Sequence, residues 1–570
     1  MSRTPSIDRA VAATAALALT LALALLAGCG GGSSSGGGDT PAPGSQSGGL
    51  SVGLAGGAPG PYRHAWVVVT SVALHTDPNR PWSPSDPSWQ VLKLDTPKLV
   101  DLATSVNGII ASLITGKPLA AGSYGQMRLF LLRHDDALSN AAKDAQLLFN
   151  AQVEVVDAAG TTRELPLEFA DGALGLRVDG PIAIAANVDN EFTVQWDLEH
   201  SLVRFASDDG VERVTMRPDL RWYDLTRTGA IIGLVDQTQF CTSGATAGCI
   251  DNVVASAELP SADGRSMVSV RSAPVVPGDQ HAAFALYPLP AAASGVTFSV
   301  VIRGRNMRTM IVRSVPAGVA DLLAANPTQL GVDMTDPDHA IPAPMVPLLS
   351  PAGDAQLSLA APAVPPSAQL VFAQTPPWSG ALPHEIAVAN TDPFSGLLAH
   401  PAALPGGDLR IADYSPTGLI TFGDAAPVEG SEHFSLTTRG RRVDDASQTV
   451  VVAAPSGSST ALSAPPATLA AGITLGTLTV DLSFGSPQSF DAAQLVVSDV
   501  GGIVATQDLS SLIGVAGAHT SVELPAGANA AALGATAVYS VAVRAWKRSS
   551  PGTSLQWARA PSSVDLRSAT

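Results

Sequence analysis

Hydrophobic and polar residues alternate along several stretches of the chain, as in β-strands with one buried face. The clearest stretch places Phe192, Val194, Trp196 and Leu198 on one face, and Glu191, Thr193, Gln195, Asp197 and Glu199 on the other. This pattern predicts that the first face is buried and the second is in water. The same alternation occurs at 66–74, 165–169 and 539–543.

Helical periodicity is scarce, and short helices are predicted only at 97–113 and 319–325. The 53 glycines and 44 prolines divide the rest of the chain into many short apolar runs. The sequence therefore predicts an all-β protein. Its predicted architecture is a series of tandem antiparallel β-sandwiches of the immunoglobulin or transthyretin type, behind a lipidated flexible tether.

Clusters of proline and glycine between the strand sets indicate the domain boundaries, each to within about ten residues. The predicted units are a signal peptide at 1–28, a Gly/Ser-rich tether at 29–49, and β domains at 50–228, 229–345, 346–460 and 461–570.

The N-terminus has the parts of an export signal, with Arg3 and Arg9 followed by an apolar stretch at 11–27. It ends in Leu26-Ala27-Gly28-Cys29, the pattern at which bacteria attach lipid to a cysteine and cleave before it. The alternative is an ordinary secretory signal that happens to end near a cysteine. The stretch that follows Cys29 favours the lipoprotein.

Residues 30–50 are rich in glycine and serine and would behave as a random coil that reaches roughly 25 Å. That distance clears a lipid headgroup layer, so acylated Cys29 would anchor the chain to a lipid bilayer. Residue 30 is Gly. Because Asp at this position favours retention in the inner membrane of enteric bacteria, we expect the outer membrane, with the periplasmic and the surface-exposed face both open.

The composition favours a folded chain, since 46% of residues are hydrophobic and only 14% are charged. The formal net charge is −17, from 32 basic and 49 acidic residues. Nucleic acid is therefore not an expected partner, because phosphate binding needs clustered Lys and Arg.

The chain has three cysteines, and Cys29 is assigned to lipid. Cys241 and Cys249 flank a glycine-containing loop between two strand-like runs, so in an oxidising periplasm we expect a disulfide. A redox pair and a metal site are the alternatives. The spacing is not the C-x₂-C of those motifs, and no His lies nearby.

The first β domain, at about 50–225, resembles a bacterial lipoprotein family known as the domain of unknown function numbered 4382. The resemblance rests on landmarks in order: a Leu-Ser-Val-Gly-Leu strand, His64 to His75, Trp89 to Leu94, Leu99 to Leu102, Leu119 to Leu129, Phe192 to Ser201, and Met216-Arg-Pro. The Asp-Ala-Pro usual in the family is replaced here by Gly56-Gly57-Ala58-Pro59. The resemblance implies a fold and a location, and no activity.

Residues 229 to about 315 resemble the transthyretin-like module found beside carboxypeptidases. The matching stretches are Gly229 to Asp236, Ala255 to Leu259, Phe284 to Pro290 and Phe298 to Arg303. The resemblance implies a seven-stranded sandwich that acts as a spacer or binding module without catalytic residues.

No enzyme motif is evident after the tether. The chain there has no G-x-S-x-G elbow and no phosphate-binding P-loop, and His384-Glu385 lacks the second His of a zinc protease. We therefore expect no enzyme, although a site assembled from distant residues stays open.

Asp333, Asp336 and Asp338 form a carboxylate cluster that has enough oxygen ligands for Ca²⁺ if carbonyls and water complete the shell. The cluster lacks the Gly and terminal Glu of an EF-hand, and a polar loop between domains is the alternative. Ca²⁺ is the only cofactor that the sequence suggests.

The loop from Asp77 to Trp89 is stiffened by proline and has two Trp residues, which are side chains that sugars or peptides stack on. Trp89 is expected to begin a strand and join the core. Trp82 is then the candidate ligand-binding residue.

Taken together, these features predict an outer-membrane lipoprotein with a binding or structural role at the cell envelope, whose partner is an unidentified glycan or envelope protein. Two alternatives stay open. One is a hydrolase of envelope polymers, and the other is a scaffold subunit of an outer-membrane assembly.

Overall fold

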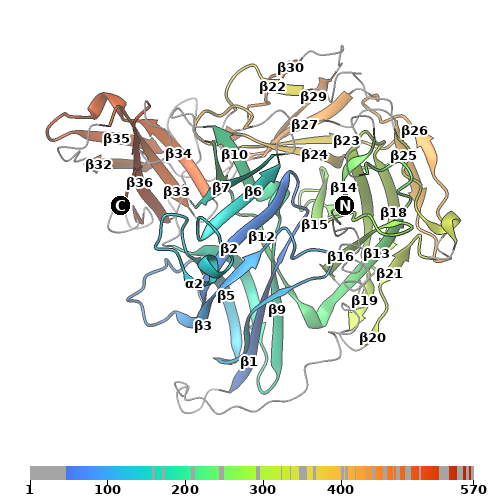
Figure 1. Cartoon of the computed structure of the whole chain (residues 1–570), viewed down its shortest axis with the longest axis horizontal. Coiled ribbons are helices and arrows are strands. Elements are labelled where there is room, and N and C mark those ends of the chain that lie inside the picture. Colours follow the sequence, from blue (N-terminus) through green and yellow to red (C-terminus); the bar gives the residue numbers. More distant parts are fainter. Residues whose placement is uncertain are drawn as a thin grey trace, which may run out of the picture.

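The computed structural model describes residues 46–565 with gaps. The gaps are 157–160, 170–173, 207–211, 243–248, 291–294, 322–323, 334–335, 346–355, 364–367, 400–403, 405–407, 418, 432, 440–442, 453–458, 467, 470–475, 482–489, 500–501, 525–537, 549–555 and 560–563. The described chain is nearly all β-strand, which confirms the predicted all-β class (Figure 1). None of its helices has the length and apolar character needed to cross a membrane.

For description we divide the chain at the predicted boundaries and call residues 47–228, 229–345, 346–460 and 461–570 the first to fourth regions. The first region has two sheets on one core. One has the order β12-β9-β1-β4 and the other β10-β11-β7-β6-β2-β5-β8, with β3 beside β2. The strands are β1 (Ser47–Gly56), β2 (Tyr62–His75), β3 (Gln90–Asp101), β4 (Ala111–Ala120), β5 (Gly122–Leu131), β6 (Ala151–Val156), β7 (Thr162–Glu168), β8 (Leu176–Ile184), β9 (Asp189–Trp196), β10 (Leu202–Ala206), β11 (Glu212–Met216) and β12 (Leu220–Asp224).

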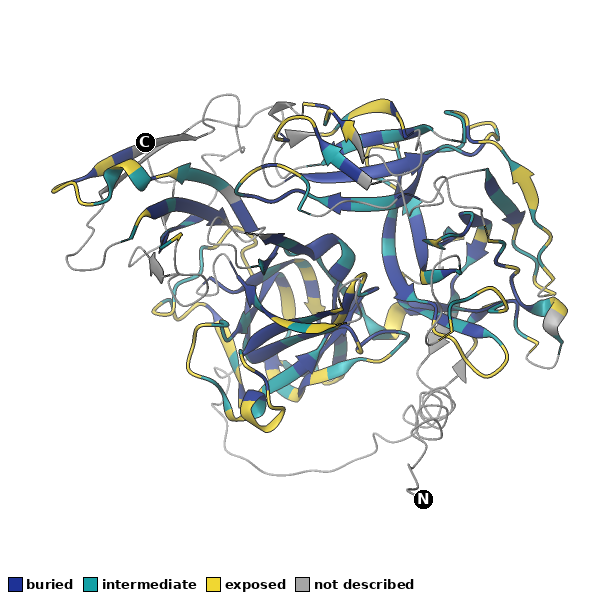
Figure 2. Ribbon diagram, turned by 45° about the horizontal axis from the view of Figure 1, so that its top comes forward, coloured by how far each residue is buried: buried dark blue, intermediate teal, exposed yellow. Residues whose placement is uncertain are grey.

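The core of the first region takes side chains from both sheets, among them Leu54, Val67, Leu129, Val153 and Trp196. Figure 2 shows buried residues along the strands and exposed residues mainly in the connecting loops. The strands predicted at 66–74 and 165–169 are β2 and β7. In β7, Leu165 and Leu167 are buried as the alternation requires. In β2, Trp66 and Thr70 are only half-buried, because a register shift between Val69 and Ser71 turns Val67 and Val69 toward the core before it, and Val72 and Leu74 after it.

The second region has two sheets, one of which extends into the third region. Their orders are β16-β13-β19-β20, with β21 beside β13, and β15-β14-β17-β18-β25-β26. The strands are β13 (Thr228–Val235), β14 (Asp251–Pro260), β15 (Met267–Pro274), β16 (Ala282–Pro290), β17 (Thr297–Arg305), β18 (Met310–Pro316), β19 (Gly318–Asp321), β20 (Ala324–Ala325), β21 (Thr328–Leu330), β25 (Leu409–Asp413) and β26 (Gly423–Ala425). Because β18 pairs with β25, the second and third regions share a sheet.

The third and fourth regions contain the remaining sheets, with orders β24-β23-β27-β29, β22-β30, β28-β31, β32-β35 and β34-β33-β36-β37, and with β38 beside β36. The strands are β22 (Gln356–Leu359), β23 (Gln369–Gln374), β24 (His384–Asn390), β27 (His433–Arg439), β28 (Val443–Asp444), β29 (Ala446–Val451), β30 (Ser459–Leu462), β31 (Thr468–Leu469), β32 (Gly476–Asp481), β33 (Ala492–Asp499), β34 (Gly502–Asp508), β35 (His519–Leu524), β36 (Val538–Trp546), β37 (Gln556–Arg559) and β38 (Val564–Asp565).

Both helix predictions were wrong. Residues 97–113 fall largely in β3, a turn and β4, and 319–325 fall in the paired strands β19 and β20. Strand pairing outweighed local propensity. Pro97 is tolerated because, among the described strands, β3 pairs only with β2, and its register shifts beside this residue. The helices that the structure describes are α2 (Asn140–Asp144), α3 (Leu198–Ser201) and the 3₁₀ turns η1 (Leu225–Arg227), η2 (Pro337–His339) and η3 (Ser510–Leu512).

The predicted solvated face of β9 was also wrong, because Thr193, Gln195 and Asp197 are buried. Thr193 lies opposite Tyr223 and Gln195 opposite Arg221 on the neighbouring strand β12. That face is covered by the second region, where Tyr223 Oη donates to Val270 O. The polar residues of β9 therefore face another part of the protein and not water.

Candidate functional site

A dense group of ionisable side chains surrounds α3, which has four residues. Asp197 caps this helix, since its carboxylate accepts a hydrogen bond from the His200 N–H at 3.3 Å. The same carboxylate lies 2.9 Å from His200 Nδ1. The cap therefore fixes both the start of the helix and the orientation of the imidazole ring.

The other ring nitrogen of His200 meets the third region. His200 Nε2 lies 2.9 Å from Glu385 Oε1 on β24, and the second oxygen of Glu385 lies 3.7 Å from Arg439 Nη1 on β27. The side chains of Asp197 and His200 are each 8% exposed and that of Glu385 is 1% exposed. The ion pair is thus nearly closed to water.

Electrostatics favour the charged form of each group. Burial opposes protonation of His200, but the charges of Asp197 and Glu385 raise its pKa well above the ordinary value. Burial also works against the two carboxylates, yet His200 lowers the pKa of Asp197 to about 2 and lowers that of Glu385. His200 is therefore an imidazolium held between two carboxylates at neutral pH.

Further contacts join α3 to the second and third regions. Glu199 accepts a hydrogen bond from Arg303 Nη2 on β17 at 2.8 Å. Asn390 Nδ2 donates to the carbonyls of Glu199 and Leu202, and Gln369 Nε2 donates to that of His200. We call this set, with Asp197, His200 and Glu385, the α3 junction.

A second buried pair lies beside the α3 junction and links the same two regions directly. His384 Nδ1 is 2.7 Å from Glu258 Oε2 on β14, and both side chains are almost fully enclosed. Burial raises the pKa of Glu258, although the hydrogen bond to His384 opposes this. The two pairs occupy neighbouring residues of β24, so one strand end holds two contacts between regions.

The α3 junction is not arranged for hydrolysis. A Ser-His-Asp relay needs one imidazole nitrogen on a carboxylate and the other free to take a proton from a nucleophile. In His200 both nitrogens face carboxylates, and the ring is buried. These charges can fix regions against each other, and the imidazole cannot act as a general base while both pairs persist.

The described surface has a polar groove between the edges of the two sheets of the first region. Edge strand β8 of one sheet lies against edge strand β12 of the other. The groove is lined by Arg177, Asp179, Pro218, Asp219, Leu220, Arg221 and Trp222. Only Pro218 was quoted in the sequence analysis, as part of the Met216-Arg-Pro landmark. The others were not singled out, because the two strands that supply them are far apart in the chain.

A known family model matches part of the chain that forms these features. Residues 47–218 match the family described as Domain of unknown function (DUF4382). This confirms the resemblance found in the sequence at about 50–225. The α3 residues and the β8 side of the groove lie inside the DUF4382 match, whereas Asp219 to Trp222 lie just beyond it.

Curated proteins and solved structures were also compared with the chain. No curated protein matches the chain. Among solved structures, the Bacillus anthracis TIE protein is similar at 8% sequence identity with a TM-score of 0.14. The similarity covers 85% of this chain and 63% of that one, so the chain spans less than two thirds of that protein.

The candidate residue Trp82 is half-buried in the DUF4382 part of the chain. Its ring lies 5.1 Å from Trp89 and 4.6 Å from Phe130, measured between ring centroids. Trp89 is buried just before β3, as predicted, and its Nε1 donates to Pro81 O. Trp82 thus packs its own loop onto β5, and ligand binding there stays a prediction.

The carboxylates proposed for Ca²⁺ lie around the turn η2. Asp336 uses its oxygens locally, since it accepts from the Asp338 N–H at 3.0 Å and lies 3.0 Å from His339 Nδ1. Over the described residues no group of three or more His, Cys, Asp or Glu side chains is placed to hold a metal ion. The contacts of Asp336 fit the alternative of a polar loop.

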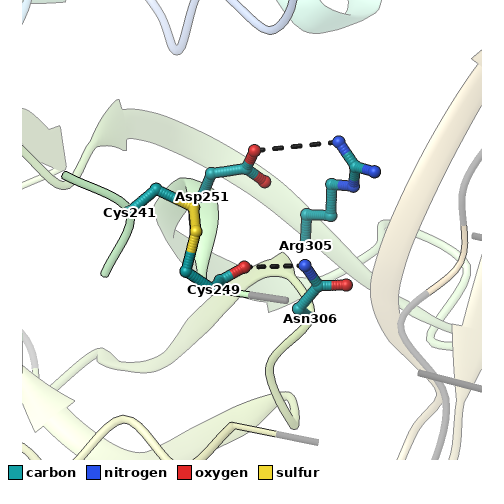
Figure 3. The surroundings of a disulfide bond; sticks show 5 residues. All are labelled: Cys241, Cys249, Asp251, Arg305 and Asn306. Carbon is teal, nitrogen blue, oxygen red and sulfur yellow. Dashed lines mark hydrogen bonds and ion pairs between the residues drawn. A yellow bond between two sulfur atoms is a disulfide. The ribbon is translucent and has the colours of Figure 1, made fainter. Parts of the chain in front are cut away.

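The predicted disulfide is present. Cys241 and Cys249 are joined, with Cα atoms 5.0 Å apart (Figure 3). Cys249 O accepts from Asn306 Nδ2 at 2.6 Å, and Asp251 lies 3.8 Å from Arg305 Nη1 on β17. These two contacts hold the start of β14 beside the end of β17, and the bridge lies just before β14 in the chain. The lipidation residue Cys29 lies outside the described residues.

We expect the double substitution Cys241→Ser/Cys249→Ser to lower the free energy of unfolding by about 2–3 kcal/mol, because a short closed loop no longer restricts the unfolded chain. Urea unfolding of the second region measures this loss. Reductant should produce the same loss in the natural protein and none in the variant. An unchanged unfolding midpoint in the variant would contradict the expectation.

Proposed function

We propose that the chain is an outer-membrane lipoprotein, anchored through acylated Cys29, whose β domains form a rigid binding module at the cell envelope. In this proposal the domains are sandwiches of the immunoglobulin or transthyretin type, and the Gly/Ser-rich stretch is the tether. The apolar signal, the Leu-Ala-Gly-Cys pattern and the glycine-rich stretch after it support the anchor.

The observation that carries the binding role is the α3 junction. Two ion pairs, Glu199 with Arg303 and His200 with Glu385, join the first region to the second and to the third. A module whose regions are held by buried charges presents its surface in one fixed arrangement. Binding gains from such preorganisation, since little conformational entropy is lost when the ligand arrives.

The anchor predicts a specific result for Cys29→Ser. The variant should lack the mass of the acyl groups and should leave the outer-membrane fraction, because no lipid attaches to serine. Intact-mass measurement and membrane fractionation check this. The Cys241→Ser/Cys249→Ser protein is the matched control and should keep the acyl mass, and acyl mass on Cys29→Ser protein would refute the anchor.

Protease treatment of intact cells then decides where the module acts. Release of peptides from residues 51–570, with a periplasmic marker protected, would place the module at the surface. Protection of all of these peptides would place it in the periplasm, facing peptidoglycan and periplasmic proteins. Either result fits a lipid anchor, so this experiment selects the partners to be tested.

A further inference from the structure

The groove between β8 and β12 has balanced charge. Two arginines, Arg177 and Arg221, face two aspartates, Asp179 and Asp219. Arg177 Nε donates to Asp179 Oδ1 at 2.5 Å, and Arg221 Nε lies 3.8 Å from Asp219 Oδ1. The formal charges of these four side chains cancel, so the lining of the groove carries no net charge.

Each of these pairs offers donors and acceptors side by side. A guanidinium only donates hydrogen bonds and a carboxylate only accepts them. A ligand that matches both must carry groups that donate and accept at neighbouring positions, as the vicinal hydroxyls of a sugar do. The Asp179 side chain is 73% exposed, so its oxygens can reach such a ligand.

An aromatic ring lies in the same groove. Trp222 is half-buried and packs edge-on against Phe192, with ring centroids 5.6 Å apart and planes at 73°. That contact holds the ring in place, and Trp222 is one of the residues that line the groove. A fixed indole is a stacking surface for the C–H face of a pyranose ring, and its rigidity limits the entropy lost on binding.

The strand that carries Trp222 is anchored from behind. Arg221 Nη1 donates to Ser269 O at 2.7 Å, and Tyr223 Oη donates to Val270 O at 2.9 Å. The two acceptors are on β15. The two donors, Arg221 and Tyr223, flank Trp222 in the sequence. The second region therefore holds β12, and with it the groove, in one position.

We propose that this groove binds a neutral oligosaccharide, with Trp222 as the stacking surface and Asp179, Arg177 and Asp219 as its hydrogen-bonding groups. The proposal deepens the binding function and rests on it. Acidic glycans and nucleic acids would need a net positive groove, and an apolar ligand would need a mainly apolar lining.

The test is calorimetric titration of the mature full-length lipoprotein, in detergent micelles, with a panel of neutral gluco-, manno- and galacto-oligosaccharides. The variants are Trp222→Ala and Asp179→Ala, the latter at an exposed position whose loss should leave the fold intact. Each should weaken binding at least about tenfold. Asp95→Ala, at a side chain 88% exposed, is the matched control and should bind like the natural protein. Trp82→Ala tests the other candidate site.

Three results would overturn the proposal. They are no heat with any neutral oligosaccharide at millimolar concentration, equal affinity in Asp179→Ala and the natural protein, and loss of binding only in Trp82→Ala. A circular dichroism spectrum of Trp222→Ala separates loss of binding from loss of fold. None of these three results tests acylation or location. The lipid anchor is tested separately by the Cys29→Ser variant.

Discussion

Glu385→Gln is expected to lower the free energy of unfolding of the α3 junction by about 3–5 kcal/mol, because it removes one of the two buried carboxylates that face His200 and the carboxylate that faces Arg439. In the variant, His200 would keep only Asp197, and Arg439 would face an amide. The substitution preserves the size of the side chain, so the loss reports on charge and not on a cavity. It is the largest single effect that we expect.

Hydrogen exchange of the peptides that contain β9, α3 and β24 measures this loss. A change of 3–5 kcal/mol corresponds to exchange that is faster by roughly two to three and a half powers of ten. The matched control is Asp95→Asn. Asp95 pairs with Lys117 Nζ at 3.2 Å but is 88% exposed, so its loss should be below about 1 kcal/mol. Equal exchange in the two variants would contradict the role given to the α3 junction.

The stability lost in Glu385→Gln should depend on pH, whereas a loss caused by a packing defect would not. Glu385 and Asp197 have lowered pKa values, so their stabilisation is present above the ordinary carboxyl range and is lost as the pH falls through the folded-state values. The pKa of His200 is raised, so its stabilisation is complete below about pH 6.5 and is lost as the pH rises through the raised value. The gap between the natural protein and Glu385→Gln should therefore shrink in acid.

Both halves of the α3 junction lie in stretches that the sequence analysis noted, but their contact was not predicted. His200 lies in the stretch from Phe192 to Ser201, which marks the family resemblance, and Glu385 lies in His384-Glu385, an incomplete zinc-protease motif. The two residues are 185 positions apart. Long-range pairing of this kind has no local periodicity, so only the arrangement of the sheets brings the charges together.

Among the features that depend on neighbouring residues, strands and the disulfide were predicted, whereas both helices were wrong because strand pairing outweighed local propensity. The strands at 66–74 and 192–196 and the Cys241–Cys249 bridge follow from alternation and from spacing. Features that depend on what covers a surface were not predicted. Thr193 and Gln195 look solvated in the sequence, and they are buried because β15 lies over their face of the sheet.

A second buried cation links the fourth region to the first and third. The guanidinium of Arg544, on β36, lies 4.2 Å from the ring centroid of Phe394, 4.8 Å from that of Trp546 and 5.9 Å from that of Phe205. Phe205 and Phe394 also contact each other, with centroids 5.1 Å apart. Three regions thus meet around one arginine that is almost fully buried.

Arg544→Ala should weaken the docking of the fourth region by about 3 kcal/mol, because it removes cation–π contacts worth about 2 kcal/mol or more when desolvated, together with the packing of the side-chain stem. Arg544→Met keeps the stem and should lose about 2 kcal/mol. In limited proteolysis, the fragment containing β33 to β36 should be released roughly a hundredfold faster from Arg544→Ala protein, since cleavage follows the population of the undocked form. Arg227→Ala, at a side chain 85% exposed, is the control and should cleave at the natural rate. If Arg544→Ala also cleaved at that rate, the fourth region would be held by its apolar contacts with Phe394, namely Val496 and Ile503, and the arginine would not determine docking.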